Sequence, residues 1–128
     1  WEQPCPELAG LIEQGHLHDD AVRKAAKEYL APMLERDIDV VVLGCTHFPL
    51  LKTLIGGVVG SHVRLISSAK EVSLDCKDLL TRREALALPG NIPTYQFASS
   101  DPDIKEFASF GERVLRMPLG EVQYAPLG

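Results

Sequence analysis

The 128-residue sequence lacks a basic surface pattern that could follow a phosphate backbone. Its 13 lysine and arginine residues are scattered among 18 acidic residues, which gives a formal net charge of -5 at pH 7. The sequence pI is near 5.3. This balance gives no reason to expect nucleic-acid binding, and we exclude nucleic acid as an expected substrate.

Long apolar runs are also missing. No stretch approaches the ~20 consecutive apolar residues that a membrane-spanning helix needs. The N-terminus shows no charged-then-apolar signal pattern. We therefore expect no association with a membrane.

Cysteine is scarce and its pattern is incomplete. Cys5, Cys45 and Cys76 are widely spaced and odd in number, which favours reduced thiols in a cytoplasmic protein over a disulfide framework. No CxxC or HxxxH spacing is present, so a zinc site would have to be assembled from scattered residues. We expect no metal ion and no other cofactor.

What the sequence does contain is an alternation of helical and strand patterns. A period near 3.6 begins after Asp19 and Asp20, which suit a helix N-terminus, and Pro32 lies where this helix would kink or end. The run Val40 to Leu43 has no polar alternation and predicts a strand covered on both faces. The further expected elements are a short helix from Pro49 to Gly56-Gly57, a strand at 63–66, a helix to about Arg83 opened by a Ser68–Glu71 capping box, a strand at 95–98 and a final helix opened by residues 100–102.

This alternation predicts an α/β layered fold with a parallel sheet. Residues 1–18 are expected to be loop-like apart from a short apolar turn that ends at Gly15. The Pro- and Gly-containing stretch "ALALPGNIP" is the best candidate for a domain boundary.

The stretch "VVLGCTHFPLL", residues 41–51, places a thiol, a hydroxyl and an imidazole side by side where a strand gives way to a helix. Ligands of parallel α/β sheets bind beyond the carboxyl ends of the strands. At such an end Cys45 can exchange protons, Thr46 can bind a carboxylate, and His47 can exchange protons with the thiol. Pattern alone leaves other interpretations open: Cys45 as a small buried apolar residue, a zinc ligand, or the nucleophile of a Cys-His-Asn hydrolase whose orienting third residue the pattern does not supply.

The same stretch resembles the second-cysteine motif of glutamate racemases, close to L-G-C-T-H-[FY]-P-L-L, at every position. Upstream, "PCPELAGLIEQG" resembles the family's A-C-P-L-F-x-P-L-x-E-x-G segment. Downstream, "VRLISSAKEVS" resembles the strand and helix start that follow in the family, and "FASSDPDIKEFASFGERVL" is similar to its last helix. The resemblance covers essentially the whole chain.

The resemblance implies roles for individual residues. Cys45 matches the acid/base cysteine of the second half of a racemase, Thr46 the substrate-contacting threonine, and His47 the histidine that assists the cysteine. Glu13 matches the glutamate that the family places near that histidine. Cys5 and Cys76 are expected to serve packing only. The remaining histidines are expected to face solvent: His16, His18 and His62.

The implied mechanism needs no cofactor. Two thiols on opposite faces of glutamate remove the α-proton and return another, which interconverts L- and D-glutamate and supplies D-glutamate for peptidoglycan. The substrate would be glutamate, and the family often forms homodimers. Other interpretations remain: an aspartate racemase-like isomerase, whose motif typically has glutamate where His47 stands, or a truncated non-catalytic binding or regulatory module.

The sequence also departs from the family. The D-S-G turn and A-C-N-T segment of the first lobe do not occur here, so we expect a C-terminal fragment or a truncated relative. Residues 1–88 would form part of the second lobe, and residues 89–128 would pack on the absent first lobe of the two-lobe architecture. The chain alone is then expected to be inactive. An apolar helix face would be exposed or buried in a substitute contact such as a dimer: Ile104, Phe107, Ala108, Phe110, Val114 and Leu115.

Overall fold

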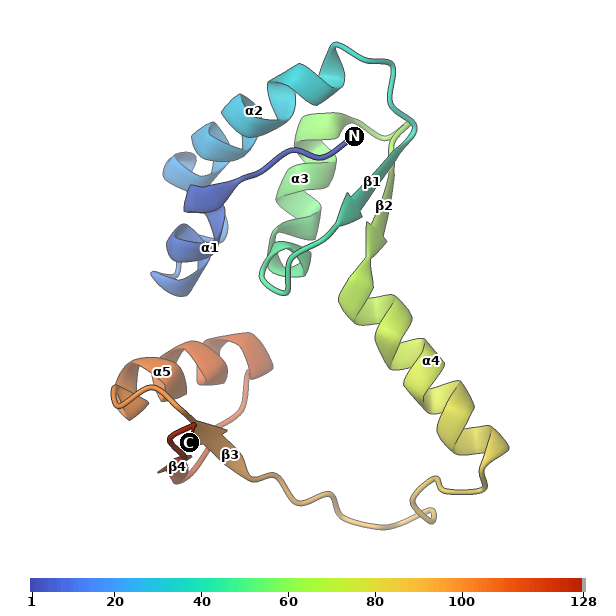
Figure 1. The fold of residues 1–128 in the computed structure, drawn as a ribbon, viewed down its shortest axis with the longest axis vertical. Helices are drawn as coiled ribbons and strands as arrows, with labels where there is room; N and C mark the ends of the chain where they lie inside the picture. Colours follow the sequence, from blue (N-terminus) through green and yellow to red (C-terminus); the bar gives the residue numbers. More distant parts are fainter. Residues whose placement is uncertain (128) are drawn as a thin grey trace. The chain divides into compact units, whose positions relative to one another are not determined.

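The computed structural model describes residues 1–127 and divides the chain into two compact units, 1–86 and 87 onward (Figure 1). The first unit contains α1 (Pro6–Glu13), α2 (Asp20–Leu34), β1 (Val40–Leu43), the 3-10 helix η1 (Phe48–Leu51), α3 (Lys52–Val59), β2 (Arg64–Ser67) and α4 (Ser68–Arg82). The second contains β3 (Phe97–Ser99), α5 (Ile104–Leu115) and β4 (Val122–Tyr124).

The core of the first unit lies between helices and a two-stranded parallel sheet. β1 and β2 pair in register from Val40 opposite Arg64 to Leu43 opposite Ser67. Helices α1, α2 and α3 lie on the same side of these strands (Figure 1). The buried apolar side chains come from α1, α2, β1, η1, α3 and the residue before β2: Leu8, Ile12, Val22, Ala25, Ala26, Leu30, Val41, Leu43, Leu51, Leu54, Ile55, Val59 and Val63. The predicted α/β fold with parallel pairing is confirmed.

Helix α2 forms as its sequence predicts. The Asp19 carboxylate accepts hydrogen bonds from the backbone N–H groups of Ala21 and Val22 at 3.0 and 3.2 Å. These two bonds satisfy N–H groups that have no partner inside the helix. Pro32 lies inside α2, and the helix continues past it to Leu34. The helix thus ends two residues after the proline, in agreement with the expected end near Pro32.

The expectation that β1 is covered on both faces is wrong for this chain. Val41 and Leu43 are buried, whereas Val40 and Val42 are 41% and 61% exposed. Successive side chains of a strand point to opposite faces, and the helices of the first unit cover only one of them. The second face of β1 is thus an apolar surface without cover in the described part of the unit.

Helices α1 and α3 differ in extent from the predictions. Residues 6–13 form helix α1 rather than a short turn, because Pro6 stands at the first helical position, where its missing N–H is not needed. Helix α3 runs through Gly56 and Gly57 to Val59, and it is capped by Gly60, whose φ of 93° suits glycine.

The prediction of a Ser68–Glu71 capping box at the start of α4 is wrong. Ser67, not Ser68, caps the helix, since its Oγ accepts a hydrogen bond from the Lys70 N–H at 3.5 Å. Ser68 instead donates its hydroxyl proton to the carbonyl of Leu43 at 3.2 Å. The second serine therefore fastens the end of β1 rather than the helix.

The second unit is a small parallel pair with one helix. β3 and β4 pair from Phe97 opposite Val122 to Ser99 opposite Tyr124. Leu119 is buried, and it reaches so close to α5 that a Cβ added at Gly111 would lie 2.6 Å from Leu119 Cδ1. Strand β4 was not predicted, because its three residues are too few to show a period.

No residue of α5 is buried, and Phe107 and Leu115 are 38% and 49% exposed. Packing of this unit on another lobe remains a prediction. Among residues 1–127, no helix combines the length and apolar character needed to cross a membrane.

Candidate active site

The residues Gly44 to His47 form the turn between the end of β1 and the start of η1. This turn lies at the carboxyl end of the parallel pair, the edge where such sheets bind ligands. The bond from Ser68 Oγ to the Leu43 carbonyl holds the strand end directly before it. The turn therefore starts from a fixed strand end.

His47 stands between the other site residues. Its Nδ1 lies 3.8 Å from Cys45 Sγ and 3.4 Å from Thr46 Oγ1. Both distances allow a hydrogen bond, because contacts to sulfur are longer than contacts to oxygen. Its Nε2 lies 2.9 Å from Glu13 Oε1. The structure thus brings together all four residues that the resemblance singles out.

Glu13 reaches the histidine from a separate element. It is the last residue of α1, which is fastened in the core by the fully buried side chains of Leu8 and Ile12. This anchoring fixes where the end of α1 lies relative to β1. The sequence alone carried no signal for this contact beyond the family resemblance.

The Glu13 contact decides which nitrogen of His47 carries the proton. A carboxylate only accepts hydrogen bonds, so Nε2 must be protonated to bind it. In the neutral ring Nδ1 is then unprotonated and can accept a proton from Cys45 or Thr46. The arrangement makes His47 a base directed at the thiol.

The site is open to solvent on this chain. The side chains of His47 and Glu13 are 25% and 53% exposed, Thr46 is exposed, and Cys45 is half-buried. Proton transfer at a weakly acidic carbon works best where water is excluded.

The other cysteines and histidines lie outside this arrangement. Cys5 is half-buried, donates to the Gln3 carbonyl at 3.5 Å, and has its pKa raised by desolvation. The expected packing role of Cys76 is wrong for this chain, because its position on α4 is exposed. Its side chain has no helix packed over it, as all of residues 69–82 are exposed.

The expectation of solvent-facing histidines holds for His18 and His62, which are exposed. His16 is only partly exposed and binds Asp19 through Nδ1 at 2.6 Å. This contact lowers the pKa of the Asp19 carboxyl, with the hydrogen bond from His16 as the main cause and the Val22 N–H next. His16 thus belongs to the start of α2.

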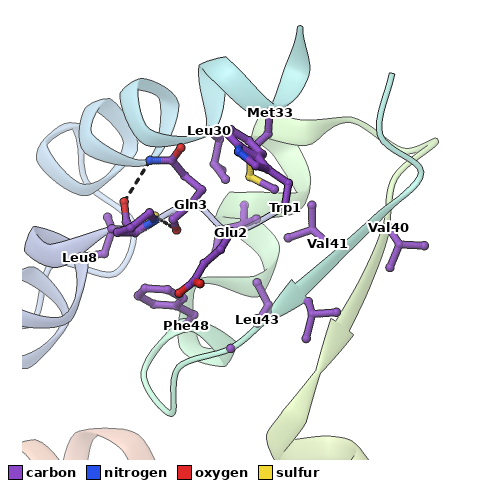
Figure 2. A pocket seen from close by; sticks show the side chains of 15 residues that line it. Trp1, Glu2, Gln3, Leu8, Leu30, Met33, Val40, Val41, Leu43 and Phe48 are labelled. Atoms are coloured by element: carbon purple, nitrogen blue, oxygen red, sulfur yellow. Dashed lines mark hydrogen bonds between the residues drawn. The ribbon is translucent and has the colours of Figure 1, made fainter. Parts of the chain in front are cut away.

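A cavity of about 370 Å³ lies beside the site (Figure 2). Figure 2 shows Trp1, Leu30 and Met33 on one side of it and Val41, Leu43 and Phe48 on another. Its lining includes Gly44 but none of Cys45, Thr46, His47 or Glu13. The cavity is mostly apolar in lining and is not where the proton-transfer groups converge.

In the described part of the chain, no three His, Cys, Asp or Glu side chains are grouped so as to hold a metal ion. No protein-family model matches the chain.

Similarity to known proteins is nevertheless extensive. The glutamate racemase of Neisseria meningitidis serogroup A is 40% identical over 126 residues, which is 98% of this chain and 46% of that protein. The glutamate racemase of Acidothermus cellulolyticus is 39% identical over 120 residues, 92% of this chain and 45% of its own length. The chain thus spans about half the length of the curated relatives it matches, and it corresponds to their C-terminal half.

Solved structures give the same result for the fold. A glutamate racemase isoform from Bacillus anthracis superposes with a TM-score of 0.86 at 32% identity, over 98% of this chain and 46% of that one. The glutamate racemase of Francisella tularensis, solved with D-glutamate, superposes with a TM-score of 0.82 at 29% identity, over 98% and 46%. The fold is therefore that of part of a glutamate racemase.

Proposed function

We propose that this chain supplies one of the two proton-transfer faces of a glutamate racemase, with Cys45 as the acid/base thiol. The observation that carries the proposal is the connected arrangement of Cys45, His47 and Glu13, in which the glutamate directs the basic nitrogen of the histidine toward the thiol. The names of the relatives support glutamate as the substrate.

In the proposed mechanism Cys45 acts on one face of the substrate α-carbon. His47 Nδ1 takes the thiol proton, and the thiolate removes the α-proton of one glutamate enantiomer. When the reaction runs the other way, Cys45 returns a proton to the same face. Thr46, exposed next to the thiol, binds the substrate carboxylate through its hydroxyl.

Inversion also needs a second acid/base group on the opposite face of that carbon. We propose that this group and the cover of the site come from the half of a racemase that this chain does not match. The exposure of the His47 and Glu13 side chains supports the need for such a cover. The 128-residue chain alone should then not racemise glutamate.

A chimera tests this proposal. The N-terminal half of the Neisseria meningitidis relative is joined to this chain, and the conversion of L-glutamate is followed by polarimetry. We expect the chimera to racemise glutamate, the Cys45→Ala chimera to lose at least ~1000-fold of that activity, and the Cys76→Ser chimera to retain it. The isolated chain serves as the inactive control.

A folded chimera that leaves glutamate unchanged, or a Cys45→Ala chimera that keeps its activity, would contradict the assignment. Conversion of aspartate in preference to glutamate would favour an aspartate racemase-like isomerase.

We also propose where in the cell the protein is located. Three free thiols and an amino-acid substrate support a location in the cytoplasm.

We further propose that the chain forms a homodimer, supported by the apolar side chains that α4 exposes: Val72, Leu79 and Leu80.

A further inference from the structure

We propose that this chain also cleaves small neutral activated esters, with Cys45 as nucleophile, His47 as general base and Glu13 as a positioning carboxylate. This activity does not depend on the chain being part of a racemase. It rests on three groups that a single unit of the chain already brings together.

The order of the groups is that of a thiol hydrolase. Such enzymes need a cysteine within reach of one imidazole nitrogen, and a third residue on the other nitrogen to hold the ring. Here Cys45 Sγ lies 3.8 Å from His47 Nδ1, and Glu13 Oε1 lies 2.9 Å from Nε2. Glu13 is thus the orienting residue that the motif by itself did not reveal.

The thiol can be reached by a small acyl group. Cys45 is only half-buried, and the neighbouring Thr46 is exposed. At Gly44, the residue before Cys45, an added Cβ would meet no atom within 4 Å outside its chain neighbours, so this part of the turn is open. A small neutral ester needs no charged partner for binding, so the proposal is limited to this class of substrate.

Acyl transfer, unlike racemisation, needs groups on one face only. His47 Nδ1 takes the Cys45 proton while the sulfur attacks the carbonyl carbon, and a C–S bond forms. The C–O bond to the alcohol then breaks, and the leaving oxygen takes the proton from His47. Water attacks the thioester with His47 as base, the C–S bond breaks, and the carboxylic acid and the free thiol are released.

The experiment uses p-nitrophenyl acetate and the 128-residue chain. The release of p-nitrophenol is followed by absorbance, and the acetylated residue is located by mass spectrometry after a short reaction. We expect acetylation at Cys45, turnover beyond one equivalent, and loss of both in Cys45→Ser. His47→Asn should reduce the rate about 100-fold, the usual effect of losing a general base.

Cys76→Ser is the matched control, because it removes an exposed thiol that has no histidine contact in the described residues. It should leave the rate unchanged. Acetylation of Cys76 to the same extent as Cys45, a rate that His47→Asn does not alter, or a release that stops at one equivalent would each overturn the proposal.

The positioning role of Glu13 has its own measurement. Glu13→Gln keeps an oxygen that can accept a hydrogen bond from the His47 Nε2–H group, whereas Glu13→Ala removes this acceptor. We expect the alanine variant to lower kcat with KM little changed, and the glutamine variant to recover most of kcat. Equal losses in both variants would overturn the role.

This test and the racemase test fail independently. A chimera that racemises glutamate beside a chain that is not acetylated would overturn only the esterase. An acetylated chain beside an inactive, folded chimera would overturn only the proposed racemase function.

Discussion

The three cysteines of the chain have three different surroundings. Cys45 lies next to a histidine nitrogen, Cys76 is exposed on α4, and Cys5 is half-buried with a pKa raised by desolvation. The thiolate is the reactive form of cysteine, so a raised pKa lowers the reactive fraction at any pH below it. Surroundings at the scale of single residues should therefore set the order of thiol reactivity.

We predict that Cys5 is the slowest of the three to react with iodoacetamide at neutral pH. Its raised pKa leaves less thiolate, and the rate should rise as the pH approaches that pKa. The measurement is peptide mapping after timed alkylation, with the exposed Cys76 as the internal reference. Alkylation of Cys5 at the rate of Cys76 would contradict the prediction.

At the same scale, the sequence revealed part of the site and concealed part. Cys45, Thr46 and His47 are adjacent in the chain, so a motif could show them. The Glu13 contact is between separate elements, and only the family resemblance indicated it. The roles of Ser67 and Ser68 could not be separated from sequence, because either serine can cap a helix and only the strand end at Leu43 decides between them.

At the scale of elements, the contact between α5 and the segment that follows it depends on one glycine. Leu119 is buried, and its Cδ1 occupies the place that a side chain at Gly111 would need. Alanine at this position would gain helix propensity and at the same time force Leu119 out of its position. The gain in helix propensity and the displacement of Leu119 therefore change the stability of the second unit in opposite directions.

We predict that Gly111→Ala destabilises the second unit by about 1 kcal/mol, because overpacking at a buried side chain outweighs the helix propensity. In a Leu119→Ala background the same substitution should instead stabilise by up to ~1 kcal/mol, since only the propensity remains. Thermal unfolding of the wild type, the two single variants and the double variant measures this double-mutant cycle. An unchanged effect of Gly111→Ala in both backgrounds would exclude the contact.

Gly57→Ala in α3 is the matched control. It is a helix-interior glycine with no atom within 4 Å of an added Cβ. It should stabilise the first unit by ~1 kcal/mol.

Elements were predictable where a period was long enough. Helix α2 has 15 residues and an aspartate cap, and its pattern identified both its type and its start. Helix α1 was missed because its Pro6 suggests a loop by composition, although proline suits a first helical turn. Which face of β1 is covered could not be predicted, because all residues of this strand are apolar and none of them indicates the face exposed to solvent.

At the scale of the whole molecule, α4 exposes several apolar side chains of the first unit. Val72, Cys76 and Leu79 follow one another at helical spacings of four and three. Asp75 and Arg82 flank the same side of this face. If two copies met about a two-fold axis, the acidic residue of one helix would face the basic residue of the other.

We predict that the chain is a dimer of 28 kDa, twice its 14.1 kDa, and that it pairs through α4. Light scattering measures the mass. The double substitution Val72→Lys and Leu79→Lys should give a monomer, because it places charges in the centre of the pairing face. Leu74→Lys is the matched control, as Leu74 is 51% exposed on the opposite side of α4.

A monomeric wild-type chain, or a Leu74→Lys variant that dissociates as readily as the double variant, would count against pairing through α4.

The groups of the site share one further property, their place early in the chain. Glu13, Cys45 and His47, and the Ser68 hydroxyl that fastens the strand end before them, all precede residue 70. A ribosome releases a protein from its N-terminus, and early parts can fold while later ones are still being made. The thiol and its base can therefore meet on a nascent chain before α5 has left the ribosome, and a premature stop after the first unit would remove none of them.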